Sequence, residues 1–136
     1  MEKMTVQEAY EKAVNGVIDQ GGFSYDVGLC LYRDDCGKKC AIGHIIPDSL
    51  YCAELEGNTV SEICVRTVLK RLIEGLDARA AALFRKIQTI HDEMAQEVHI
   101  LDVRKKLEIF RGRCIDAGKA HHLDTFRISE VSITEG

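Results

Sequence analysis

The sequence predicts an α+β fold that is predominantly α-helical, with about four main helices and a small β-hairpin or short sheet. Apolar residues recur at helical spacing in four stretches and alternate with polar residues in two shorter ones. A single proline and 6% aromatic residues are more typical of helices than of a β-sandwich. The length, 136 residues, gives room for one core, so residues 1–136 are expected to form a single domain.

The first helix is expected to begin at Thr5. Thr5 and Glu8 have the spacing of a capping box, in which each side chain binds a free backbone N–H of the first turn. Apolar residues follow at helical spacing until Gly21-Gly22 ends the helix. A second helix is expected over residues 61–74, where apolar residues again recur at helical spacing.

Two further helices are expected after Asp77, a residue suited to cap a helix N-terminus. Their apolar stripes consist of Phe84, Ile87, His91, Met94 and Val98 in the third helix and of Ile100, Val103, Leu107, Phe110, Cys114 and Ala117 in the fourth. The stripes are out of phase, and one helix of about forty residues would be unusual. A break is therefore expected at residues 99–102, with antiparallel packing of the pair.

The segment between the first and second helices is expected to hold the β-structure. Alternation of apolar and smaller or polar residues predicts a strand at residues 27–33, followed by a turn at residues 34–37. One or two helical turns are expected from Cys40 to about Ile46. They end there because the residue before Pro47 avoids helical geometry.

The C-terminal tail alternates in the same way over residues 126–133. An isolated strand is not stable alone, so two arrangements are open. The tail pairs with residues 27–33, or residues 126–136 form an arm that is exchanged with a second subunit. The second arrangement would make the protein a homodimer.

Composition favours a water-soluble cytoplasmic protein. The net charge is −4, 46% of the residues are apolar, and no apolar run approaches the ~18 residues of a membrane span. The first residues contain no apolar signal core, so export is not expected. The six cysteines are therefore expected to be reduced thiols.

A zinc site is one interpretation of the cysteine-rich segment. Cys36, Cys40 and His44 are four residues apart, and Cys30 is close in sequence. Three thiolates and one imidazole form a tetrahedral zinc site. The simpler interpretation is that Cys30, Cys40, Cys52 and Cys64 are buried and act as small apolar side chains, and no cofactor is otherwise expected.

A second interpretation makes Cys40 a nucleophile. A position at a helix N-terminus would favour its thiolate, as would the two preceding lysines. A thiol enzyme also needs a base, for which His44, His91 and Asp92 are the candidates. Asp92 is not expected to orient His91, because neighbours on a helix point about 100° apart.

His91 also belongs to an apolar stripe, and two roles are weighed for it. The first is a neutral, hydrogen-bonded histidine of the core. The second is a ligand, metal or proton-transfer group. The first role is the commoner one for a buried imidazole, and we expect it here.

The fourth helix carries five basic residues off its apolar stripe: Arg104, Lys105, Lys106, Arg111 and Arg113. A basic helix face could bind nucleic acid or an acidic protein. No aromatic residues alternate with the basic ones as stacking platforms, and the chain is acidic overall. A solvated helix surface is therefore the simpler interpretation.

One motif resembles a group of small uncharacterised proteins of bacteriophage and bacterial genomes. It reads Cys30-x-Tyr32-Arg33, then Gly37-x-Lys39-Cys40-Ala41-Ile42-Gly43-His44-x-Ile46-Pro47-Asp48-x-x-Tyr51 and Glu56-Gly57, followed by Gln88-x-Ile90-His91-Asp92. The resemblance implies a phage-like origin and a shared pocket or structural knot, but no activity. The extra Cys36 and the alternating tail lie outside the pattern.

The resemblance also implies that the motif residues gather in one place. Tyr32, Arg33, Asp48 and Tyr51 are the candidate binding residues. Within this cluster Asp48 is expected to cap a turn, and Arg33 to pair with an acidic group such as Asp92 or Glu56.

Three classes of function are open from the sequence. A non-enzymatic protein that binds and modulates a host protein is favoured by the small size and the lack of a catalytic motif. A thiol enzyme using Cys40 and a zinc-clipped structural or nucleic-acid-binding module are the alternatives.

Overall fold

The computed structural model describes residues 2–25 and 31–132. Over these residues the chain is predominantly helical, with four α-helices and two single 3-10 turns. Their bounds are α1 Val6–Gln20, η1 Ile42–His44, η2 Ala53–Leu55, α2 Ile63–Leu72, α3 Ala78–Gln96 and α4 Val103–Ala120. None of these helices combines the length and apolar composition needed to cross a membrane.

The predicted ends of α1 and the predicted start of α3 are confirmed by hydrogen bonds. Thr5 and Glu8 form both bonds of the capping box, and Gly21 ends α1 with the left-handed φ of 79°. Asp77 caps α3 and Asp102 caps α4 through their carboxylates. The break between the last two helices is therefore confirmed as well.

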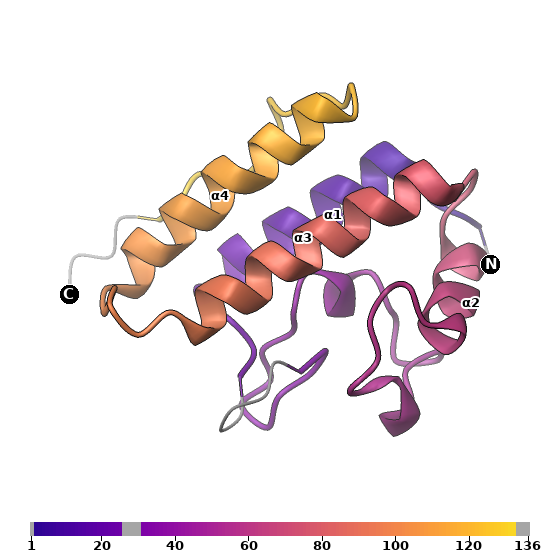
Figure 1. Cartoon of the computed structure of the whole chain (residues 1–136), viewed down its shortest axis with the longest axis horizontal. Helices are drawn as coiled ribbons and strands as arrows, with labels where there is room; N and C mark the ends of the chain where they lie inside the picture. Colours follow the sequence, from indigo (N-terminus) through magenta and orange to yellow (C-terminus); the bar gives the residue numbers. More distant parts are fainter. Residues whose placement is uncertain (1, 26–30, 133–136) are drawn as a thin grey trace.

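Three helices form one layer, which we call the helical layer: α1, α3 and α4 (Figure 1). α3 and α4 are antiparallel and pack most extensively, and α1 contacts both. The largest fully buried side chains of the layer are Tyr10, Phe84 and Phe110. Tyr10 donates its hydroxyl to the carbonyl of Cys114 at 2.8 Å, and a Cβ at Gly118 would overlap the Tyr10 side chain. Gly118 thus allows α1 and α4 to approach closely.

α2 is shorter than predicted, because the chain leaves helical geometry at Ile73. Ile73 and Met4 form an isolated parallel bridge, with Met4 N–H donating to the Leu72 carbonyl at 2.8 Å and Glu74 N–H donating to the Met4 carbonyl at 2.8 Å. The N-terminal segment thereby ties α2 to the start of α1.

Residues 31–60 form an irregular region below the helical layer, which we call the loop lobe (Figure 1). The expected β-hairpin is not found in the described part of the chain. Residues 27–30 of the expected strand lie outside it, and residues 31–33 contribute only the isolated bridge between Arg33 and Lys39. The turn at 34–37 is confirmed: Gly37 N–H donates to the Asp34 carbonyl, and the Asp34 carboxylate accepts from two further backbone N–H groups.

As far as residue 132, the C-terminal tail does not pair as a strand with residues 31–33, the described part of the expected strand; its exchange with a second subunit is not tested by a single chain and stays a prediction. It turns back after α4 and lies on α1 and α4 of its own chain. Ile128 is 4% exposed there, and side chains of Asn15 and Arg111 bind the tail backbone. The tail has no strand partner because these side chains take up backbone groups that a strand would offer to a neighbour.

Candidate functional site

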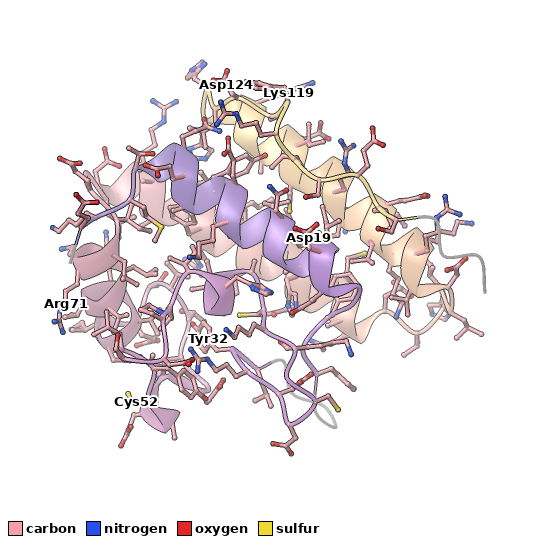
Figure 2. All side chains as sticks on the ribbon, turned by 180° about the vertical axis from the view of Figure 1, so that it is seen from behind. Asp19, Tyr32, Cys52, Arg71, Lys119 and Asp124 are labelled. Atoms are coloured by element: carbon pink, nitrogen blue, oxygen red, sulfur yellow. The ribbon has the colours of Figure 1, made fainter. Side chains whose placement is uncertain are left out.

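The motif side chains gather in the loop lobe and where it meets the helical layer. Tyr32, labelled in Figure 2, lies in the loop lobe, and its backbone carbonyl accepts from Cys40 N–H at 3.2 Å. Its hydroxyl donates to the Asn58 carbonyl at 2.5 Å. Burial raises the pKa of Tyr32, and the charges of Asp92 and Glu56 add to this effect.

Glu56 is the central acceptor of the loop lobe. Its carboxylate accepts from the backbone N–H groups of Tyr32 at 2.8 Å and Arg33 at 3.2 Å. It also accepts from the Tyr51 hydroxyl at 2.6 Å, a bond that raises the pKa of Tyr51 to about 12. One half-buried side chain therefore holds two separate segments of the lobe together.

Arg33 pairs with Asp48, and not with either of the acidic groups expected from the sequence. Its guanidinium donates to the Asp48 carboxylate at 2.6 Å and to the Ile46 carbonyl at 3.0 Å. It also lies over the Tyr51 ring, 4.2 Å from the ring centre. The Glu56 carboxylate accepts from the backbone N–H of Arg33, and the Arg33 guanidinium pairs with Asp48 instead. The Asp48 side chain is 89% exposed, so this pair is worth little to stability by itself.

Cys40 has the opposite environment to the one a nucleophile needs. The residue is 1% exposed, and its sulfur accepts the backbone N–H of Gly43 at 3.2 Å. Burial raises the pKa of the Cys40 thiol by more than this hydrogen bond lowers it. The expectation that the helix N-terminus favours a thiolate at Cys40 is wrong, because desolvation outweighs the short 3-10 turn.

His44 is held as a neutral ring beneath α1. Its Nε2 lies 2.9 Å from Oε1 of Gln20, and because an amide oxygen only accepts, Nε2 carries the proton. Burial and, to a lesser extent, the nearby charge of Lys39 together lower the pKa of His44 to about 4. A Cβ at Gly16 would overlap the imidazole, so this glycine makes room for the ring against α1.

Gln20 joins α1 to the loop lobe. Besides His44, its carbonyl oxygen accepts from Lys39 N–H at 3.0 Å. Its amide nitrogen donates to the carbonyls of Lys39 and Gly22, both at 2.7 Å. Sequence analysis missed this residue, because nothing local distinguishes a glutamine in the last turn of a helix from a solvated one.

His91 is a neutral, hydrogen-bonded histidine of the core, as predicted. It is fully buried, and its Nε2 accepts from Ser24 N–H at 3.3 Å. Its Nδ1 lies 3.0 Å from the Asp92 carboxylate, and Phe23 contacts the ring edge-on at 5.4 Å. The expectation that Asp92 cannot orient its neighbour is wrong, because side-chain torsions bring the two ends together although their Cβ atoms diverge.

The expected metal ligands do not assemble within the described residues. No group of three histidine, cysteine, aspartate or glutamate side chains there could hold a metal ion. Cys36 is exposed, the Cys40 sulfur is buried against Gly43, and the His44 Nε2 is bonded to Gln20. Cys30, the remaining candidate, lies outside the described residues.

The five basic residues of α4 do not form one face. Arg111 donates to the Ser129 carbonyl of the tail at 2.8 Å. Arg113 lies on the side of α3, 3.5 Å from Glu93, and Arg104 is 3.5 Å from Glu108. Lys105 and Lys106 make no ion pair among the described residues. Three of the five are thus engaged with the tail or lie beside a carboxylate, and nucleic-acid binding by this set stays a prediction.

No protein-family model, curated protein or solved structure matches the chain. Function is therefore inferred from the contacts of this chain alone. Within the described residues, the candidate catalytic and binding side chains form hydrogen bonds inside the loop lobe or between it and α1 and α3.

Proposed function

We propose that this protein is a non-enzymatic binding protein of phage-like origin that modulates a host protein in the cytoplasm. The observation that carries the proposal is the exposed apolar tip between α3 and α4, which we define as residues 98–103. Val98 is 73% exposed, Leu101 87% and Val103 46%. Single exposed apolar residues are normal, but a group of three in one short connection is typical of an interaction site.

The surroundings of the tip also suit a protein partner. A hollow of about 490 Å³ opens beside it, lined by Val98 and the buried Met94 and otherwise by polar and charged side chains, among them Glu97 and Arg113. An apolar residue beside polar and charged groups is the common composition at the rim of a protein interface. The hollow could receive a side chain of the partner while Leu101 inserts into the partner's surface.

The buried state of the candidate catalytic groups favours binding over thiol chemistry. Cys40 is inside the core, and the neutral ring of His44 is bonded to Gln20. Both ring nitrogens of His91 have partners as well. A thiol enzyme would need a thiolate and a base at an accessible surface.

Photo-crosslinking at the tip tests the proposal. A photoreactive residue is placed at Leu101 and, as a matched control, at Ile63, an isolated apolar side chain on α2 that is 83% exposed. In cells, we expect the probe at position 101 to give one adduct of defined mass, and Val98→Asp to lower its yield about tenfold. Equal labelling from positions 101 and 63, or no effect of Val98→Asp, would contradict the proposal.

A further inference from the structure

The C-terminal tail is bound to α1 through its backbone. The Gln7 amide donates to the Asp124 carbonyl at 2.9 Å and accepts from Asp124 N–H at 3.0 Å. Two helical turns along, the Asn15 amide donates to the Arg127 carbonyl at 3.0 Å and accepts from Ser129 N–H at 2.6 Å. Each amide therefore satisfies one donor and one acceptor of the tail.

The other side of this groove is formed by α4. Arg111 donates from Nε to the Ser129 carbonyl at 2.8 Å and from its guanidinium to the Ile128 carbonyl at 3.5 Å. Figure 2 shows the tail running back from Asp124, near Lys119, along the seam between α1 and α4. The groove is thus equipped to bind the backbone of a non-helical segment from both sides.

Among residues 124–129 of the tail, Ile128 is the one buried side chain, and Val131 further along is partly buried against the core. Ile128 is 4% exposed, whereas Phe126 is 75% exposed. In tail residues 124–129, which Gln7, Asn15 and Arg111 contact, the preference of the groove for this sequence therefore depends on the branched aliphatic side chain of Ile128. The remaining contacts depend on the backbone, which any chain supplies.

The connection between α4 and the tail contains a strained residue. His122 has φ 60°, and it is the one non-glycine residue with positive φ among the described residues. This conformation lets His122 N–H and Leu123 N–H reach carbonyls of the last turn of α4. An imidazole side chain makes the conformation unfavourable, so a tail that leaves the groove would relieve strain at this hinge.

We propose that the groove between α1 and α4 is a binding site for the C-terminal tail of a second copy of this chain. A second copy carries the same backbone groups and the same Ile128, so every contact described above forms equally well between two chains. Exchange of an identical element is a low-cost route to a dimer, and the strained hinge favours its open form. The closed monomer observed here is the competing state.

Complementation between two full-length variants tests this proposal. Ile128→Asp leaves the groove intact but removes the anchor of the tail. Asn15→Ala leaves the tail intact but removes the groove's two bonds to Arg127 and Ser129. In a mixture, the Asn15→Ala chain supplies an intact tail and the Ile128→Asp chain supplies an intact groove.

Native mass spectrometry of the mixture measures the heterodimer. We expect its population to exceed that of either homodimer by about tenfold, since neither homodimer offers an intact tail to an intact groove. As a matched control, Phe126→Ala is mixed with Lys12→Ala, two changes at exposed positions outside these contacts, and this mixture should show no excess of heterodimer over random pairing of the two chains. Ile128→Ser replaces Ile128→Asp if the charged variant does not fold. A mixture that stays monomeric, or equal heterodimer in the control, would overturn the proposal.

Discussion

The helical layer and the loop lobe are stabilised by different means. The helical layer buries large apolar side chains such as Phe84 and Phe110, and its backbone hydrogen bonds lie mostly within the helices. The described residues of the loop lobe have almost no regular structure, and polar side chains satisfy much of their backbone. Glu56 and Gln20 form four bonds to backbone groups of residues 31–60 between them, and Asp34 accepts two more.

This difference explains why the motif is rich in residue types associated with catalysis. A segment without a sheet partner still has to satisfy its buried N–H and C=O groups. Carboxylates, amides and imidazoles are the side chains that can do so. Their presence in this lobe therefore indicates a structural need before it indicates chemistry.

The largest expected effect concerns the helical layer. Phe110→Ala removes a fully buried ring that contacts Phe23 edge-on at 5.8 Å. We expect the free energy of unfolding to fall by about 4 kcal/mol, because the lost burial and the remaining cavity both cost stability. Urea unfolding measures this loss, with Phe126→Ala at an exposed position as the control. A loss below about 1 kcal/mol would show that the layer can repack around the cavity.

The second prediction concerns pH and the interface between the two regions. The folded chain lowers the pKa of His44 from 6.5 to about 4, so the unfolded chain binds the proton first as pH falls. The stability that depends on a neutral His44 is fully present above pH 6.5 and is lost as the pH falls from 6.5 through 4. The loss at His44 amounts to about 2–3 kcal/mol.

His44→Gln isolates this contribution, because an amide still donates to Gln20 but does not titrate between these pH values. We expect the stability of the wild-type chain to fall more steeply than that of the variant from pH 6.5 to 4. Urea unfolding at several pH values measures both curves. Parallel curves would mean that His44 titrates equally in the folded and unfolded chains.

The smallest effect is expected inside the loop lobe. Glu56→Ala removes the acceptor of Tyr32 N–H, Arg33 N–H and the Tyr51 hydroxyl. We expect a loss of about 2 kcal/mol, since water reaches this half-buried site and replaces part of the bonding. Glu54→Ala, at an exposed neighbouring position, should change stability far less than Glu56→Ala.

Hydrogen exchange locates the effect of Glu56→Ala. The amides of Tyr32 and Arg33 should exchange faster in the variant, while amides in the middle of α3 change little. Equal acceleration in both regions would contradict the division into two separately stabilised parts.

The helices could be predicted from the sequence because their signals are local. Caps lie within three residues of the helix start, and apolar stripes repeat every three or four residues, so Thr5, Asp77 and the break before Val103 were all identified. The single turn at η1 was identified from Pro47 in the same way.

The contacts of the loop lobe could not be predicted in this way. Glu56 binds residues 23 and 24 positions away, and Gln20 binds Lys39 across 19 positions. Alternating apolar residues suggested a strand that includes Tyr32 and Arg33, but the Glu56 carboxylate takes the N–H groups that a neighbouring strand would use. The approach of Asp92 to His91 likewise depends on side-chain torsions, which no sequence spacing specifies.

The cysteines differ in exposure, and this has a practical consequence for purified samples. Cys40 and Cys114 are buried, and burial raises the pKa of both thiols, whereas Cys36, Cys52 and Cys64 are exposed. The expected burial is therefore confirmed for Cys40 and wrong for Cys52 and Cys64. Air oxidation should therefore begin at the exposed three and link separate chains covalently. A dimer that dissociates when reductant is added reports this oxidation, whereas an exchanged tail persists in reductant and dissociates on dilution.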